Sequence, residues 1–347
     1  MISIAVAGAG AIGRRHAHLL GASARARLCA VVDPTAAAQE FASAARVPHY
    51  DSLQALFAAQ KPDGVILATP NPLHVPGALE CALRGVSALI EKPVADTVAQ
   101  GNILLRALSQ TDVPMLVGHH RRHSAALQAA RACIAQGRLG RIVTVMGSAQ
   151  FCKPDSYFEQ GPWRMEKGGG PVLINLIHDM DSLRCLCGEI VQVQAMASRS
   201  VRGFEVEDSA VVSLRFASGA LGSFTLSDTA AAPLSWEQTS GENPEYPRHA
   251  DQDCYFISGT QGSLAVPTLR TWRYPGERSW VVPFAQHQLP HAEIDPLSAQ
   301  LEHFCDVIAR RCAPLVSVAD ALQSLRVVEA VARSIETGSV VDPLEPA

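Results

Sequence analysis

The chain has 347 residues, 48% of them hydrophobic and 18% charged, and its formal net charge is −4. This length predicts two domains, while the charge excludes a basic field for nucleic acid, and no apolar run is long enough to span a membrane. Nine scattered cysteines without paired Cys-x-x-Cys spacing and a start without a signal-peptide layout predict reduced thiols in the cytoplasm, with neither disulfides nor a zinc ribbon.

The chain opens with a buried-strand pattern that runs into a glycine turn and then into an amphipathic helix over residues 12–20. In a Gly-x-Gly-x-x-Gly turn the first glycine permits the bend, the second lets the backbone approach a pyrophosphate, and the third lets the helix pack close to the strand. The first N–H groups of the helix then point at the phosphates. The expected phosphate contacts are Gly8, Gly10, Ala11, Ile12 and Gly13.

The second apolar run, residues 28–32, ends in Asp33, twenty positions after Gly13. A carboxylate at this place accepts both ribose hydroxyls of a dinucleotide and repels a 2′-phosphate, so NAD is favoured over NADP. The glycine motif is weak evidence alone, but here the strand before it, the helix after it and the acid all fit.

Strands and helices alternate through the rest of the first 119 residues. We expect strands at 47–50, 65–69, 88–90 and 113–117, and helices at 35–45, from the cap Asp51 or Ser52 to 58, and at 75–83 and 95–109. Such alternation predicts a doubly wound parallel sheet, which binds ligands at the carboxyl ends of its strands. Gly8, Asp33, Thr69 to His74 and Glu91 to Pro93 all follow strands in this way.

The pattern changes after residue 119. A helix over 123–136 is followed by strands at 142–151, 191–198, 210–216, 221–226, 255–258 and 263–266, and Ser218-Gly219 predicts a hairpin turn between two of them. Helices are expected at 171–186, 295–311 and 317–338. The fold class is therefore α/β, with a Rossmann domain over residues 1–119 and a second domain over 120–347 built on an open, mostly antiparallel sheet.

Two groups of motifs resemble one known family. The first combines Gly8-Ala-Gly-Ala-Ile-Gly13, Thr69-Pro-Asn71 with His74, and Glu91-Lys92-Pro93. The second is a run of three glycines, 168–170, which let the chain pass close to a cofactor, followed by His178 and Asp181. Together they resemble the glucose–fructose oxidoreductase, inositol dehydrogenase and rhizopine-catabolism (Gfo/Idh/MocA) family of oxidoreductases.

The resemblance implies a set of roles. Lys92 would contact the nicotinamide and the substrate oxygen, Glu91 would lie near the nicotinamide ribose, and His178 would be the general acid/base. Thr69, Asn71 and His74 would lie at the cofactor, and the bond before Pro93 is often cis in the family. The resemblance also implies C-terminal helices that pack across both domains and a homodimer or homotetramer formed through the exposed face of the second sheet.

The chain departs from the family pattern at one position. The family has an acid four residues before the histidine, where this chain has Ile174; the nearest polar group is Asn175, which can form hydrogen bonds but carries no charge. This change leaves the carboxylate role and the usual sugar-binding pattern open, while the histidine and lysine remain.

Further candidates follow the last strand of the first domain and the first strand of the second. His119, His120 and His123 have a spacing that could bind a metal, but two adjacent arginines raise the cost of binding a cation and no carboxylate is near in sequence, so a metal site is disfavoured. The resemblance implies that His120 and Arg121 are substrate or cofactor contacts, because the family has a similar stretch at this junction, and we interpret Arg122 as structural. The segments 153–164 and 232–253 are expected to be loops over the site, in which the substrate candidates are Tyr157, Trp163 and Arg164.

The leading functional hypothesis is hydride transfer between NAD and a secondary alcohol of a small cyclic polyol or sugar. His178 would take the hydroxyl proton and Lys92 would stabilise charge on the oxygen. The alternatives are a dehydrogenase of an aromatic cis-dihydrodiol, whose carboxylate would meet Arg121 or Arg164, and an NAD-dependent glycoside-cleaving enzyme. A non-enzymatic NAD-binding regulator is disfavoured because both Lys92 and His178 are present.

Overall fold

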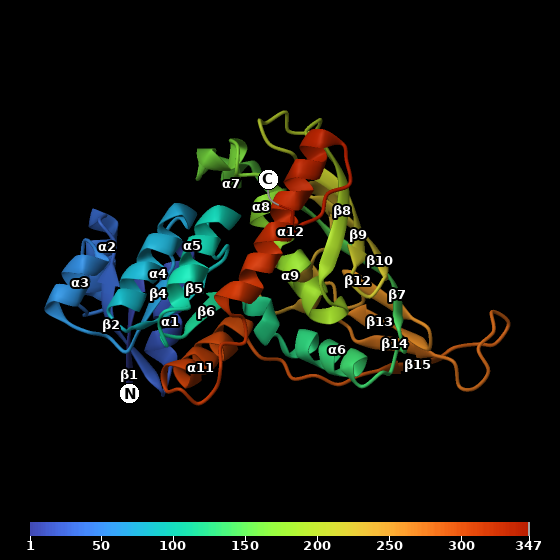
Figure 1. The fold of residues 1–347 in the computed structure, drawn as a ribbon, viewed down its shortest axis with the longest axis horizontal. Helices are drawn as coiled ribbons and strands as arrows, with labels where there is room; N and C mark the ends of the chain where they lie inside the picture. The colour runs from blue at the N-terminus through green and yellow to red at the C-terminus, as the bar shows by residue number, and fades with distance from the viewer. Residues whose placement is uncertain (346–347) are drawn as a thin grey trace. The chain divides into compact units, whose positions relative to one another are not determined.

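The computed structural model describes residues 1–345 and divides the chain into two compact units (Figure 1). Unit 1 comprises Met1–His123 and Pro296–Leu325, and unit 2 comprises Ser124–Asp295 and the chain from Arg326 onward. From the sequence we placed all of 120–347 in the second domain, whereas the contacts assign residues 120–123 and 296–325 to unit 1. None of the helices within residues 1–345 has the length and apolar character that a bilayer crossing needs.

Unit 1 is built on a six-stranded sheet in the order β3-β2-β1-β4-β5-β6, in which every pairing is parallel. Three of its strands, β4, β5 and β6, are fully buried and mostly apolar, the pattern of a sheet covered on both faces. The predicted doubly wound parallel sheet is thus confirmed. Its strands are β1 (Ile2–Ala7), β2 (Ala26–Val32), β3 (His49–Tyr50), β4 (Gly64–Leu67), β5 (Ser87–Glu91) and β6 (Met115–Gly118).

Two helices of unit 1 begin at side-chain caps. Ser52 accepts a hydrogen bond from the Ala55 N–H at 3.2 Å, and Thr97 accepts one from the Gln100 N–H at 3.3 Å, so the latter helix begins three residues later than expected. The helical segments are α1 (Ala11–Ala22), α2 (Ala36–Ala44), α3 (Leu53–Ala59), η1 (Asn71–Leu73), α4 (His74–Leu83), α5 (Val98–Leu108), η2 (His120–His123) and α11 (Pro296–Ile308).

Helix α11 belongs to unit 1 because its apolar stripe completes the core of the parallel sheet. Leu301, Phe304 and Val307 are at most 3% exposed and share one cluster with Ile66 and Leu89. Burial of these three large side chains contributes several kcal/mol to stability. The sequence pattern alone does not indicate which of the two sheets the helix packs against.

Unit 2 contains a nine-stranded sheet in the order β15-β14-β13-β12-β7-β10-β9-β8, with β11 paired to β7. Only the β10–β7 pair is parallel among the strand pairs, so the expected open, mostly antiparallel sheet is confirmed. Three strands, β11, β14 and β15, were not expected because they are short and carry polar residues or alanines. The strands are β7 (Ile142–Cys152), β8 (Ile190–Ser198), β9 (Ser209–Phe216), β10 (Leu221–Ser227), β11 (Thr229–Leu234), β12 (Tyr255–Gly259), β13 (Gly262–Val266), β14 (Arg270–Arg273) and β15 (Ala285–Gln288).

The helices of unit 2 include two that pack on one face of this sheet, α6 and α9 (Figure 1). Along the strands, buried and exposed residues alternate, as in β9. The helical segments are α6 (Ala125–Ala135), α7 (Asp155–Glu159), η3 (Pro162–Met165), α8 (Pro171–Ile174), α9 (Leu176–Cys187) and α10 (Trp236–Ser240); α12 (Val318–Thr337) belongs to unit 1 up to Leu325 and to unit 2 from Arg326.

Candidate active site

The glycine turn after β1 has one open position between two tightly packed ones. Gly8 has φ +94°, and a Cβ there would lie 2.3 Å from the carbonyl oxygen of Ala68. A Cβ on Gly13 would lie 1.9 Å from the carbonyl oxygen of Gly8, but a Cβ on Gly10 would have no heavy atom within 4 Å. Gly8 and Gly13 are therefore required by the fold itself, and the space beside Gly10 fits the close approach of a pyrophosphate.

Asp33 follows β2 and its carboxylate is held in place by the glycine turn. Oδ2 accepts a hydrogen bond from the Ala9 N–H at 2.9 Å, and Oδ1 accepts from the N–H and the hydroxyl of Thr35 at 2.9 and 2.6 Å. Burial alone would raise the pKa of Asp33, but these hydrogen bonds outweigh it and lower the pKa. The ionised carboxylate keeps lone pairs for ribose hydroxyls, so the residues present fit an NAD dinucleotide.

His74 joins the loops that follow β4 and β5. Its Nδ1 lies 2.7 Å from the Pro93 carbonyl oxygen and its Nε2 lies 2.8 Å from the Thr69 carbonyl oxygen. The ring is 1% exposed, and burial lowers its pKa. Asn71 begins η1 in the first of these loops, and the bond between Lys92 and Pro93 in the second is cis, as expected. The cofactor contacts of Thr69, Asn71 and His74 stay predictions.

Glu91, the last residue of β5, faces the interior of unit 1. Its Oε1 lies 2.7 Å from His16 Nε2, and its Oε2 accepts the Lys92 N–H at 3.2 Å. Burial would raise the pKa of Glu91, but the contact with His16 outweighs it and lowers the pKa. The carboxylate therefore anchors the start of the Lys92 loop, while its expected contact with the nicotinamide ribose stays a prediction.

The four residues of η2 follow β6. Arg121 is 4% exposed, and the Arg122 guanidinium lies 3.4 Å from the Asp320 carboxylate, which agrees with a structural role for Arg122. His120 lies close enough to Glu91 to help lower the pKa of that carboxyl. Within residues 1–345 no three His, Cys, Asp or Glu side chains are grouped to hold a metal ion. The substrate contacts predicted for His120 and Arg121 stay predictions.

The three glycines of unit 2 pack against residues of the same unit. A Cβ on Gly169 would lie 2.4 Å from the Trp163 carbonyl oxygen, and a Cβ on Gly170 would lie 2.3 Å from the Glu207 carboxylate. Glu207 accepts the Val172 N–H at 2.8 Å at the start of α8, and burial raises its pKa. Close packing within the unit thus accounts for two of these glycines.

The helix predicted over 171–186 is confirmed on both sides of Asn175, as α8 and α9, but it is interrupted at that residue. Asn175 has φ −104° and ψ −51°, between the end of α8 and the start of α9. Its Oδ1 accepts a hydrogen bond from Lys153 Nζ at 2.8 Å, and its carbonyl oxygen accepts the His178 N–H at 3.1 Å. Asn175 is therefore the polar residue of the turn that leads into α9 and His178.

Two of the aromatic and arginine candidates lie against each other. The Arg164 guanidinium is 3.8 Å from the centre of the Tyr157 ring and donates a hydrogen bond to the Tyr157 carbonyl oxygen. Trp163 is 54% exposed, whereas Trp236 is buried and packs on Tyr255. The substrate roles of Tyr157, Trp163 and Arg164 are untested by this geometry.

A buried ionic network beside Asn175 was missed from the sequence. Lys153 Nζ lies 3.3 Å from the Asp228 carboxylate, and Arg202 Nε lies 3.0 Å from the other oxygen of that carboxylate. A signal was present: Lys153-Pro154 directly follows a strand, as Lys92-Pro93 does. Asp228 and Arg202 lie in loops whose pairing only the fold reveals.

Models of known protein families match residues in both units. A model of the oxidoreductase family with an NAD-binding Rossmann fold matches residues 2–119, and a model of the GFO/IDH/MocA C-terminal domain matches residues 127–265. Fold and site thus define an NAD-binding oxidoreductase of the dehydrogenase type. The chain belongs to the Gfo/Idh/MocA family.

Several relatives are similar over most of the chain. The 1,5-anhydro-D-fructose reductase of Ensifer adhaerens is 28% identical over 288 residues, which cover 81% of this chain and 79% of the relative. The inositol 2-dehydrogenase of Rhizobium meliloti (strain 1021) is 32% identical over 219 residues, covering 61% of this chain and 64% of the relative. The crystal structure of the WlbA dehydrogenase from Bordetella pertussis with NADH and UDP-GlcNAcA is 27% identical, with a TM-score of 0.79 over 100% of this chain and 99% of that one.

Proposed function

We propose that this protein transfers hydride between NAD and a secondary alcohol of a small cyclic polyol or sugar. One observation carries the proposal: a chain with an NAD-binding first unit keeps a lysine directly after β5 and a histidine in the first turn of α9. The relatives support it, because their names identify a sugar derivative and a cyclitol as substrates.

In the proposed reaction, bound NAD supplies the acceptor for the hydride of the substrate carbon. His178 takes the hydroxyl proton as the C–O double bond forms, so the substrate loses one proton and one hydride. The Lys92 ammonium donates a hydrogen bond to the same oxygen and stabilises its developing negative charge. Asn175 holds the turn before α9 through its carbonyl oxygen, which fixes the backbone of His178.

The test is a screen for NADH absorbance with cyclitols, sugars, nucleotide sugars and dihydrodiols. With a substrate found, His178→Ala is expected to lower kcat by about 10²- to 10⁴-fold, because the proton acceptor is lost. NAD binding, measured by calorimetry, is expected to stay near the wild-type value because the glycine turn and Asp33 are untouched. Turnover at the wild-type rate in this variant would refute the role of His178.

The same screen distinguishes the alternatives. Release of a sugar from a glycoside without net NADH would identify the oxidise–eliminate–reduce route. Turnover confined to aromatic cis-dihydrodiols would identify the other dehydrogenase activity. NAD binding without turnover of any compound would support a regulator.

We also propose that the chain forms a homodimer or homotetramer through the open face of the unit 2 sheet. Met146 and Phe256 are paired across β7 and β12, Val211 and Met196 across β9 and β8, and their exposures range from 38% to 72%. An apolar surface of this kind is more stable when covered. Light scattering of the purified protein tests the proposal, and a monomer at micromolar concentration would contradict it.

We place the protein in the reducing cytoplasm. All nine cysteines are free within residues 1–345, and seven of them are buried or half-buried. Burial raises the pKa of Cys81 and Cys187 to about 12, so these thiols stay protonated and unreactive.

A further inference from the structure

His16 is a buried histidine that no step of the proposed reaction uses. It is 1% exposed, and its Nε2 lies 2.7 Å from Oε1 of Glu91, which is 6% exposed. Gly118 pairs with Glu91 across β6 and β5, and a Cβ there would lie 3.1 Å from the carboxyl carbon and from Oε2 of Glu91. The lack of a side chain at Gly118 therefore leaves room for the carboxylate, which is contacted from α1 and from β6.

These contacts fix both the charge and the direction of the Glu91 carboxyl group. Burial would raise its pKa, but the hydrogen bond with His16 and the nearby His120 and Lys92 together lower it, so the group is ionised. A carboxylate has no proton to donate, so the hydrogen bond runs from His16 Nε2 to Oε1 in either charge state of the ring. The second oxygen, Oε2, accepts the Lys92 N–H at 3.2 Å. One carboxylate thus joins a residue of α1 to the start of the Lys92 loop.

The same carboxylate acts on the charge of Lys92. The charge of Lys92 is one of the causes that lower the pKa of Glu91, and the attraction between two opposite charges stabilises both of them. Ionised Glu91 therefore favours the ammonium form of Lys92. This form donates hydrogen bonds and stabilises negative charge on a substrate oxygen, whereas a neutral amine brings no charge to that oxygen.

His16 also connects this carboxylate with the dinucleotide turn. Helix α1 begins at Ala11, directly after Gly10, and its buried residues are Gly13, His16, Ala17 and Leu20. Close packing restricts the side chains of a buried helix face to few conformations. The helix that follows the phosphate-binding turn therefore also carries the hydrogen-bond donor of Glu91, so the carboxylate is held in a fixed position relative to that turn.

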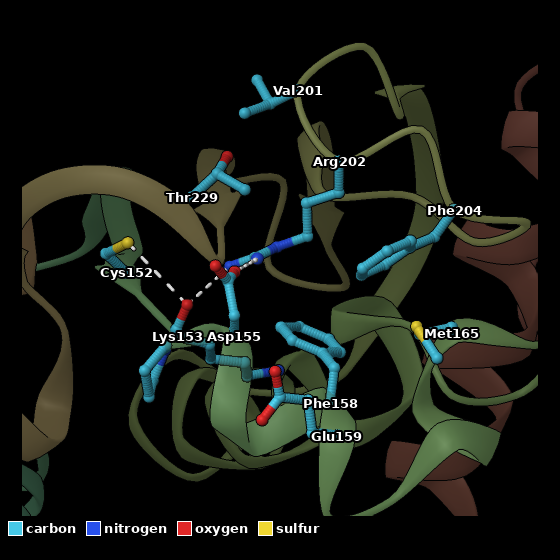
Figure 2. A pocket seen from close by; sticks show the side chains of 11 residues that line it. Cys152, Lys153, Asp155, Phe158, Glu159, Met165, Val201, Arg202, Phe204 and Thr229 are labelled. Atoms are coloured by element: carbon cyan, nitrogen blue, oxygen red, sulfur yellow. Dashed lines mark hydrogen bonds and ion pairs between the residues drawn. The ribbon is translucent and has the colours of Figure 1, made fainter.

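The buried ionic network of unit 2 is balanced within itself. Asp228 pairs with Lys153 and Arg202 at 3.3 and 3.0 Å, and the carboxylate of Asp208 accepts the Arg202 N–H at 3.0 Å. Figure 2 shows Arg202 extending toward Asp155 across the adjoining pocket, which has a volume of about 810 Å³. That network needs no further charge, whereas the Glu91 carboxylate of unit 1 also acts on a residue of the proposed reaction.

We propose that His16 is a positioning residue: it holds the Glu91 carboxylate against the Lys92 loop, so that Lys92 meets the substrate oxygen as an ammonium group. This inference rests on the proposed function, in which Lys92 donates a hydrogen bond to that oxygen. In this role His16 acts only through Glu91 and exchanges no proton with the substrate.

Four variants separate the parts of this pair. His16→Gln and His16→Asn carry the same amide donor, but the glutamine amide reaches about as far as Nε2 of the histidine, whereas the asparagine is one methylene shorter. Glu91→Gln removes the charge of the carboxylate and keeps its size. His18→Asn is the matched control, because His18 is an exposed histidine of the same helix.

The first measurement needs no substrate. Acetic anhydride acetylates amines only in their neutral form, so the labelling rate of each lysine against pH gives the midpoint at which that lysine loses its proton. Peptide mass spectrometry measures Lys92 separately from Lys61 and Lys167, which are exposed and serve as internal controls. A general loosening of the fold would raise labelling rates without moving these midpoints.

The expected shifts follow from the charge next to Lys92. In Glu91→Gln the Lys92 midpoint should fall by about one pH unit, because the neighbouring negative charge is lost. In His16→Asn it should fall by a smaller amount, because the carboxylate keeps its charge but is no longer held in place. His16→Gln and His18→Asn should keep the wild-type midpoint.

The second measurement uses the substrate that the NADH screen identifies. His16→Asn is expected to lower kcat about tenfold, with KM and the Kd for NAD changed much less, because the Lys92 ammonium stabilises charge that develops during the reaction. His16→Gln should restore most of the lost kcat, which a merely structural role of the ring would not produce.

Three results would overturn the proposal: an unchanged Lys92 midpoint in Glu91→Gln, wild-type kcat in His16→Asn, or equal losses of kcat in His16→Gln and His16→Asn. Where His16→Asn fails to fold, the Lys92 midpoint in Glu91→Gln and kcat in His16→Gln still decide the matter. Absence of turnover with every compound would refute the proposed function, and the Lys92 midpoints would then decide alone whether the pair acts on the lysine.

Discussion

Gly10 offers a direct test of the dinucleotide site, because the fold does not need a glycine there. Its φ is −68° and its ψ is −172°, a backbone conformation open to alanine, and a Cβ would have no heavy atom within 4 Å. Gly10→Ala should therefore leave the free protein as stable as before, or more stable by about 0.4–1 kcal/mol, since alanine restricts the unfolded chain. NAD binding should weaken, because the new methyl group takes the space through which the pyrophosphate approaches the backbone.

The expected size of the effect follows from ligand linkage. NAD at about 100 times its wild-type Kd stabilises the native state by about 2.7 kcal/mol. If the methyl group weakens binding about tenfold, the same concentration stabilises the variant by about 1.4 kcal/mol, roughly half as much. Thermal unfolding without NAD measures the stability of the free protein, and unfolding with NAD measures the added stabilisation. Calorimetry gives the Kd for NAD directly.

Gly21→Ala is the matched control. Gly21 lies near the end of α1, the helix that Gly10 precedes, and a Cβ there also meets no heavy atom within 4 Å, but it is remote from the turn. This variant should show the same or higher stability and an unchanged Kd for NAD. Should Gly10→Ala bind NAD as tightly as wild type, the pyrophosphate does not lie beside Gly10 and our account of the turn is wrong.

Two further predictions concern unit 1. Asp33→Ala should reduce the preference for NAD over NADP, because the carboxylate that accepts ribose hydroxyls and repels a 2′-phosphate is lost; an unchanged ratio of the two Kd values would contradict this. Burial, aided by His303 at a ring distance of 5.1 Å, lowers the pKa of His123 to about 3, so the native state keeps this ring neutral. Stability from this group is present above about pH 6.5 and is lost as the pH falls toward 3, about 2 kcal/mol of it by pH 5. His123→Phe should lose correspondingly less stability than wild type between pH 8 and pH 5 in urea unfolding, and equal losses would exclude His123 as the source.

Local signals in the sequence determined most of the first unit. Gly8 has a positive φ and Gly13 packs against the carbonyl oxygen of Gly8, which are requirements that act over a few residues, and Ser52 caps its helix as expected. The buried strands were evident because a sheet covered on both faces needs unbroken apolar runs.

Features that depend on distant partners were decided only by the tertiary structure. The helix over 171–186 has the right periodicity, yet it breaks at Asn175, where a hydrogen bond from Lys153, 22 residues earlier, engages the side chain. The assignment of α11 to the parallel sheet depended on where Phe304 and its neighbours are buried.

The sequence by itself therefore indicated the kind of fold, the cofactor and the lysine and histidine of the family motifs, because each of these depends on a short local sequence pattern. Only the tertiary structure joined Lys153, Asp228 and Arg202, because these residues are brought together by strands and loops far apart in the chain. These side chains form ion pairs only because the fold buries them together, and an ion pair between distant residues produces no periodic pattern in a sequence.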